Sequence, residues 1–204
     1  MTMAKVEIGQ EQQTRCTGCS QLVRSYDIVN VGSLEKGYRA LCGRCFNTEM
    51  AELDGLDRFE HFNLEPVRLV DCIGENHEFH FRTHLFGTGV ALDAFELRDG
   101  HPAGYQFQLI GDPEEDLLVL LGRLIEKIRR GLSIKHVKDE EYGLQIADHR
   151  VVRGKIEWDE SAGGSVPLLS IDGREITWQD FGHMLMSFEG WQFKLEIRDK
   201  SEDL

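Results

Sequence analysis

The sequence lacks any long run of apolar residues. The longest run in its 204 residues extends only from Leu117 to Leu121, far short of the roughly 20 residues that a membrane-spanning helix needs. Residues 1–7 also lack the apolar core of a secretory signal peptide. We therefore expect a cytoplasmic protein that has no membrane partner.

Positive charge is also scarce. The chain has 23 Lys and Arg residues against 36 Asp and Glu residues, which gives a formal net charge of −13. A surface of this sign excludes general attraction to nucleic acids and anionic lipids. Phosphate-binding glycine loops, the nucleophile elbow of α/β-hydrolases and the HExxH metalloprotease motif are absent as well. Since no motif indicates a reaction, we expect a non-enzymatic protein.

Cysteine is present in an informative pattern. Four of the five cysteines form two C-x2-C pairs, Cys16–Cys19 and Cys42–Cys45, that lie within one 30-residue segment. This spacing is typical of a closed tetrahedral site, and Gly18 and Gly43 provide small residues inside each pair. We predict one structural zinc ion per chain, with iron as the alternative because four thiolates bind it too. The predicted ligands are Cys16, Cys19, Cys42 and Cys45.

The residues around the cysteine pairs predict a small zinc module. Two strand-like stretches, 22–31 and 38–41, flank a turn at Gly32–Ser33. A helix is expected after Cys45, with an apolar stripe formed by Phe46, Met50 and Leu53 and an end at Gly55. With a knuckle, a hairpin and a second knuckle that opens a helix, residues 13–58 resemble treble-clef zinc fingers such as the ClpX-type zinc-binding domain.

This resemblance implies a binding role, because ClpX-type fingers serve protein recognition or dimerisation and other treble clefs bind nucleic acid. Residues 14–46 carry a net charge of +3, but a zinc ion with four thiolates contributes −2. A protein partner or self-association is therefore expected over nucleic acid. Nucleic-acid binding through Arg24, Lys36 and Arg39 stays open as an alternative.

A second, larger domain is expected after a polar stretch, residues 54–65. From Pro66 the apolar residues alternate with polar ones, which predicts strands near 67–70, 77–86, 90–97 and from 105 onward. Turns separate these strands, so we predict an antiparallel meander with one buried face. The predicted domain covers residues 66–198 and is followed by a polar tail, residues 199–204.

Two helices complete the predicted domain. The first should begin at Asp112 as N-cap with Pro113 as the first helical residue, and should stop at Gly131. Asp172–Gly173 predicts a hairpin. A short helix capped by Thr177 follows it, with a stripe of Trp178, Phe181, Leu185 and Phe188 and a final strand at Trp191–Ile197. The fold class is α+β, with a largely antiparallel sheet and two helices, and we interpret this acidic domain as an interaction domain.

Three histidines occur on the strand expected at 77–86. His77, His80 and His84 follow an H-x2-H-x3-H pattern, and His80 and His84 share a face with Arg82. We interpret this face as exposed and polar. The alternative is an enzyme whose site lies on the His80/Arg82/His84 face, joined by Asp71 and Asp93.

The fifth cysteine, Cys72, has no catalytic signature around it. Its neighbours Val70 and Ile73 predict a buried strand thiol rather than a nucleophile. An aromatic group near the C-terminus is interpreted as a packed corner rather than a cofactor pocket. Its members are Trp178, Phe181, Phe188, Trp191 and Phe193.

Overall fold

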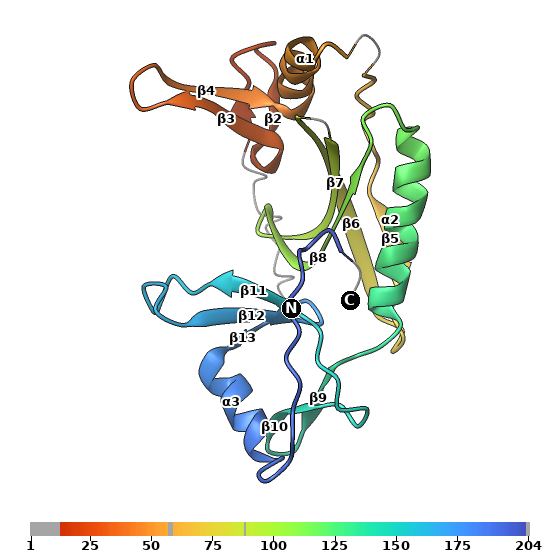
Figure 1. Cartoon of the computed structure of the whole chain (residues 1–204), viewed down its shortest axis with the longest axis vertical. Coiled ribbons are helices and arrows are strands. Elements are labelled where there is room, and N and C mark those ends of the chain that lie inside the picture. The colour runs from red at the N-terminus through yellow and green to blue at the C-terminus, as the bar shows by residue number, and fades with distance from the viewer. Residues whose placement is uncertain (1–12, 57–58, 88, 203–204) are drawn as a thin grey trace, which may run out of the picture.

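A computed structural model of the chain describes residues 13–56, 59–87 and 89–202. The end of the predicted zinc module, residues 57–58, and the end of the polar tail, residues 203–204, lie outside these ranges. Within the described ranges, three α-helices accompany sheets whose strands all pair antiparallel (Figure 1). The α+β class is confirmed. No helix in these ranges has the length and apolar character that crossing a bilayer requires.

The N-terminal module consists of two short ladders and one helix. Its elements are β1 (Gln13–Arg15), β2 (Leu22–Arg24), the 3-10 turn η1 (Ser25–Asp27), β3 (Ile28–Ser33), β4 (Gly37–Cys42) and α1 (Gly43–Asp54). β1 pairs with β2, and β3 pairs with β4. The turn of the second hairpin lies at residues 34–36, because Gly32 and Ser33 still pair with Tyr38 and Gly37. The predicted turn at Gly32–Ser33 was therefore placed too early.

Helix α1 buries its small residues more deeply than the apolar stripe that the sequence predicts. Its buried residues are Gly43, Asn47 and Ala51, whereas Leu53 is exposed. The predicted stripe is right in part, because Phe46 and Met50 are half-buried and pack against neighbouring hydrophobic clusters. Small residues and one amide let the helix approach the neighbouring sheet closely. The helix ends at Gly55, which has φ 69°, as predicted.

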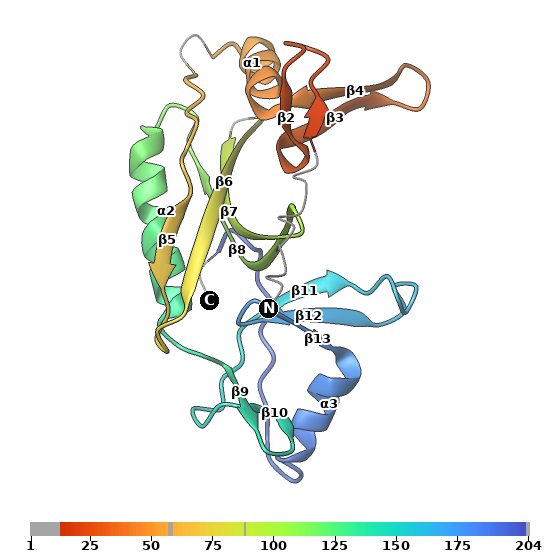
Figure 2. The ribbon, with the colours of Figure 1, turned by 180° about the vertical axis from the view of Figure 1, so that it is seen from behind.

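The central sheet is a four-stranded antiparallel meander in the order β5-β6-β7-β8, as predicted (Figure 2). Its strands are β5 (Val67–Val70), β6 (Asn76–Phe86), β7 (Gly89–Arg98) and β8 (His101–Gly111). Helix α2 (Leu117–Leu132) covers one face, where Leu120, Leu124 and Ile128 pack with Phe79 and Leu92 of the sheet. This layer of helix on sheet forms the largest hydrophobic cluster of the described chain.

Helix α2 begins later and ends later than predicted. Asp116 is its N-cap and accepts a hydrogen bond from Leu118 N at 2.8 Å, while Asp112 accepts one from Glu114 N within the preceding turn. Aspartate is a favourable N-cap at either position. The helix begins after Asp116 because that residue directly precedes Leu117, the first buried leucine. Gly131 lies inside the helix, where a Cβ would approach the Phe107 ring to 2.6 Å. Close packing, not helix termination, explains this glycine.

The C-terminal unit builds its own small core. It contains β9 (Val137–Glu140), β10 (Gly143–Ile146), β11 (Lys155–Trp158), β12 (Pro167–Ile171), β13 (Arg174–Thr177) and α3 (Trp178–Met186). The hairpin at Asp172–Gly173 is confirmed, as is the Thr177 cap, whose Oγ1 accepts from Asp180 N at 3.1 Å. The buried residue of α3 is Met184. Part of the predicted stripe is wrong, because Trp178 and Leu185 are exposed.

The predicted last strand, Trp191–Ile197, pairs with no other strand of the described chain. Residues 191–200 are all exposed, and the chain runs from the end of α3 back toward the central sheet as a single extended segment (Figure 1). Its far end is held by Lys127, whose Nζ donates to the carbonyls of Ser201 and Glu202. The prediction of a paired strand was wrong for the isolated chain.

Candidate metal centre

Four cysteine sulfurs gather where the first hairpin meets the start of α1. The Sγ atoms of Cys16, Cys19, Cys42 and Cys45 all lie within 4.8 Å of one another. Cys16 and Cys19 come from the loop between β1 and β2, Cys42 ends β4, and Cys45 lies in the first turn of α1. The four nearby cysteines can hold a metal ion.

The spacing of the sulfurs suits a tetrahedral ion. A zinc–sulfur bond of about 2.3 Å places the sulfurs of a tetrahedron about 3.8 Å apart. The Sγ atoms of Cys19 and Cys42 lie 3.9 Å apart, a contact far too long for a disulfide. All four cysteines are free thiols and supply an all-sulfur ligand set. The residues present therefore fit a closed four-thiolate centre.

Backbone groups are turned toward these sulfurs. Cys42 N donates to Cys16 Sγ at 3.2 Å. Burial would raise the pKa of the Cys16 thiol, but hydrogen bonds from the backbone of Cys19, Cys42 and Gly18 outweigh it and lower that pKa to about 6. Burial raises the pKa of Cys45, and thiol contacts with the other three cysteines raise it further. The backbone thus favours negative charge at one sulfur before any cation is considered.

The two glycines inside the pairs serve by their small size. A Cβ on Gly18 would lie 3.0 Å from Cys45 Sγ, and a Cβ on Gly43 would lie 2.6 Å from Asp27 Oδ1. Neither glycine has the left-handed backbone that would demand it. The sequence correctly marks these positions as small, and the structure shows that close approach is the reason.

The cysteine module docks on the central sheet through Asn47, which the sequence analysis missed. β5 pairs only with residues 76–79 of β6, so no strand of the described residues lies beside the edge of β6 beyond them. The fully buried amide of Asn47 fills that edge: its Nδ2 donates to Thr83 O at 2.8 Å and its Oδ1 accepts from Leu85 N at 2.9 Å. One side chain of α1 therefore replaces a strand. The sequence does contain one sign of this role: Asn47 lies four residues after Gly43 and four before Ala51, so it shares a helix face with two small residues.

The turn η1 covers the polar face of β6 and β7. Arg82 donates to Tyr26 O at 3.0 Å and to Asp93 Oδ2 at 3.0 Å. The Tyr26 ring packs against Phe95 at 5.2 Å and against His80 at 6.0 Å. The sequence gives no sign that Tyr26 contacts residues more than 50 positions away.

The face that carries His80, Arg82 and His84 is therefore an interface within the molecule. His80 is buried, and His84 packs against the Phe46 ring at 5.7 Å. Burial and, to a smaller degree, the nearby Arg82 lower the pKa of His84 to about 4, so its imidazole is neutral at neutral pH. The prediction of an exposed polar face was wrong because the cysteine module lies on it.

Of the two carboxylates named in the enzyme alternative, Asp93 joins this face as the ion-pair partner of Arg82, and Asp71 belongs to a different group. Asp93 holds Arg82 and accepts from Gln108 Nε2 at 2.6 Å. The Oδ2 atom of Asp71 lies 3.3 Å from His77 Nε2 and 2.7 Å from Lys135 Nζ. Burial would raise the pKa of Asp71, but hydrogen bonds from Lys135, from the Glu75 backbone and from His77 lower it well below its usual range.

Asp71, Glu75 and His77 form a second group whose ligand atoms lie close together. The ammonium of Lys135 already supplies the positive charge there, and Asp71 also accepts from the amides of Ile73 and Glu75. This arrangement is a satisfied ion-pair network that joins the β5–β6 turn to the segment after α2. Because its cation is already present, we assign no metal to it.

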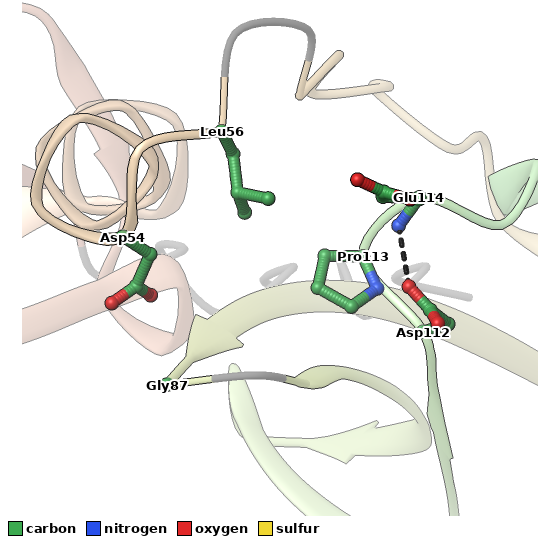
Figure 3. A pocket seen from close by; sticks show the side chains of 6 residues that line it. All are labelled: Asp54, Leu56, Gly87, Asp112, Pro113 and Glu114. Carbon is green, nitrogen blue, oxygen red and sulfur yellow. Dashed lines mark hydrogen bonds between the residues drawn. The ribbon is translucent and has the colours of Figure 1, made fainter.

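A cavity of about 360 Å³ opens between the end of α1 and the turn that precedes α2 (Figure 3). Three of the described lining residues are acidic, and none of them is a cysteine, serine or histidine of the kind that serves as nucleophile or base in many enzymes. The lining residues are Asp54, Leu56, Gly87, Asp112, Pro113 and Glu114.

Two of the three basic residues in the nucleic-acid alternative are engaged within the molecule. Arg24 contacts Tyr26 and His80, and Arg39 makes two hydrogen bonds to the Glu49 carboxylate. Lys36 lies at the exposed hairpin turn. Internal pairing leaves less of this charge for phosphates.

Two smaller predictions are corrected. Cys72 is exposed, because it lies in the turn after β5, where its amide donates to Leu132 O and its side chain points outward. The aromatic corner exists in part: Phe188 packs on Trp191 at 5.7 Å and Trp178 on Phe181 at 5.9 Å. Phe193 lies outside it and is exposed.

Comparison with known proteins shows similarity to three families that have no assigned function. Residues 15–57 match a domain of unknown function (DUF7685), residues 60–133 match another (DUF7686), and residues 136–202 match a third (DUF7713). None of these is a zinc-finger family. The divisions fall between α1 and β5 and between α2 and β9. No curated protein and no solved structure matches the chain.

Proposed function

We propose that this protein is a non-enzymatic zinc protein in which one structural zinc ion is held by Cys16, Cys19, Cys42 and Cys45. The carrying observation is the convergence of four thiols within 4.8 Å on a hairpin end and a helix start. Knuckle, hairpin and helix follow one another as in treble-clef fingers, which supports zinc over iron as the ion.

The proposed role of the ion is structural: it fixes the relative positions of α1 and η1, the two elements through which the cysteine module contacts the central sheet. Cys42 and Cys45 flank the start of α1, the helix that carries Asn47 to the edge of β6. Cys16 and Cys19 precede β2 and η1, which carry Tyr26 to the polar face. With few buried apolar residues of its own, the module depends on the metal for its folding free energy.

We further propose that the protein acts by binding other proteins rather than nucleic acid. Its net charge of −13 supports this, as does the internal pairing of Arg24 and Arg39. Large apolar side chains on the surface of the C-terminal unit support it too. They include Ile156, Trp158, Trp178 and Met186.

Metal analysis of the purified full chain tests the zinc proposal. Wild type should contain one zinc ion per chain, and Cys42→Ser should lose it, because three thiolates and a hydroxyl no longer close the site. Cys72→Ser is the matched control: it removes an exposed cysteine outside the cluster and should keep the metal.

Three results would contradict the proposal. Purified wild type that takes up no zinc when zinc is added rules out the site. If the purified protein contains iron and shows the visible absorption of iron bound to thiolates, the ion is iron and not zinc. Metal that survives in Cys42→Ser places the site elsewhere in the chain.

A further inference from the structure

The segment Trp191–Ile197 has the pattern of a half-buried strand but is not buried. Its odd-numbered residues are large and apolar and its even-numbered residues are polar. The apolar four are exposed by 60% (Trp191), 89% (Phe193), 74% (Leu195) and 69% (Ile197). Leaving four such side chains in water costs free energy that a partner surface recovers.

The backbone of this segment is unpaired as well. Among the described residues, no backbone hydrogen bond involves residues 192–197. Both ends are nevertheless fixed: Trp191 N donates to Phe188 O, and Lys127 holds the carbonyls of Ser201 and Glu202. The segment is thus presented as an extended strand with free edges, which is a template for adding another strand.

The sequence of the segment is complementary to itself. In an antiparallel pair of two copies centred on Leu195, residue i faces residue 390 − i, so Leu195 faces its own copy. Phe193 then faces Ile197 on the apolar side, and Lys194 faces Glu196 on the polar side. Each of these pairs occurs twice by symmetry, and opposite charges and apolar pairs placed directly across a ladder are stabilising.

A register centred on the neighbouring Lys194 is less favourable. It sets all four apolar residues opposite apolar ones, whereas the Leu195-centred register sets Trp191 opposite Asp199, but it places Lys194 against its own copy. Registers centred between two residues set apolar side chains against polar ones. The alternation of side chains therefore leaves these two residue-centred registers, and the Lys194–Glu196 charges favour the one centred on Leu195.

We propose that Trp191–Ile197 is a dimerisation strand that pairs antiparallel with the same segment of a second copy, with its two-fold axis at Leu195. Pairing satisfies one backbone edge and gathers eight large apolar side chains on one side of the ribbon. Lys194, Glu196 and Arg198 keep the opposite side charged, which limits further edge-to-edge growth.

Charge reversal tests both the partner and the register. Sedimentation or light scattering of the full chain should give twice the 23.3 kDa chain mass for wild type. Lys194→Glu and Glu196→Lys should each weaken self-association about tenfold or more, because two facing pairs become like-charged. The double variant should restore it. Lys36→Glu, on the exposed turn between β3 and β4, changes the net charge by the same amount as Lys194→Glu and should leave the dimer intact.

Mixing the two single variants separates contacts between copies from contacts within one chain. Lys194 and Glu196 also lie 3.1 Å apart within one chain, so either single change removes that pair too. In the mixture, every Lys194→Glu chain can face a Glu196→Lys chain with opposite charges at both positions. We expect a heterodimer to form in the mixture.

Each of the following results overturns the proposal. Wild type that stays monomeric up to tens of micromolar excludes a dimerisation strand. A dimer unaffected by both charge reversals, or one that mixing does not rescue, pairs elsewhere or in another register. Strong amide protection of residues 192–198 in a monomer means that the segment folds onto its own chain.

Discussion

At the scale of single residues, Asn47 joins two parts of the molecule that lie far apart in the sequence. Its carboxamide has the same donor and acceptor as a peptide group, and it meets the free edge of β6 with both. A third contact runs from Nδ2 to His61 Nδ1 at 3.1 Å. Because Asn47 is fully buried, no water can replace these bonds if the amide is removed.

Asn47→Ala should lower the free energy of unfolding by about 2–4 kcal/mol, since it leaves Thr83 O and Leu85 N buried without partners. Urea unfolding followed by circular dichroism measures this loss, and faster amide exchange at Leu85 localises it. Asn30→Ala removes an exposed amide from β3 and serves as the control. Equal effects of the two substitutions would contradict the role assigned to Asn47.

At the scale of elements, helix α2 shows how one residue type serves different purposes. Gly122 and Gly131 both lie inside the helix. A Cβ at Gly122 meets nothing within 4 Å, whereas a Cβ at Gly131 would meet the Phe107 ring at 2.6 Å. Gly122 therefore lowers the stability of the helix without a role in packing, whereas Gly131 allows the close packing of α2 on β8.

Gly122→Ala should raise the free energy of unfolding by about 0.5–1 kcal/mol, because alanine favours the helix and restricts the unfolded chain. Gly131→Ala should gain the same propensity but lose more by displacing Phe107 from its packed position. Thermal unfolding of the two variants beside wild type compares them directly. A stabilised Gly131→Ala would show that α2 and β8 separate at little cost.

At the scale of the whole molecule, the C-terminal unit is tied to the central sheet by a few polar contacts. Lys135 follows α2 and reaches Asp71 at 2.7 Å and the Tyr105 hydroxyl at 3.2 Å. The Asp71 side chain is fully buried, so its charge depends on that ammonium. The turn at Gly173 also lies against Tyr105, since a Cβ at Gly173 would come within 2.9 Å of its ring.

Lys135→Met should destabilise the protein by about 2–3 kcal/mol, because it leaves a buried carboxylate without its main partner. Protease cleavage between α2 and β9 should become faster, since the join between the units loosens. Lys138→Met breaks only exposed ion pairs with Glu140 and Asp148 and should leave stability and cleavage unchanged. If both variants behave alike, the Asp71 network does not hold the units together.

The sequence by itself determined the cysteine pattern, the α+β class, the meander, the turn at Asp172–Gly173 and the caps at Gly55 and Thr177. Each of these depends on residues close together in the chain, where spacing, backbone freedom and side-chain alternation act directly. The four thiols were predictable for the same reason, since the two cysteines of each pair are only three positions apart in the chain.

Only the tertiary structure decided what covers each surface. Alternation predicts two faces for β6 but does not reveal that Tyr26 and Asn47 cover the second face and the free edge. The exposure of Cys72 and of Trp191–Ile197 likewise depends on which segments lie beside them. Strands and helix caps depend on neighbours within a few residues, so the sequence predicts them. Burial depends on neighbours that are distant in the sequence, and a local pattern carries no information about those neighbours.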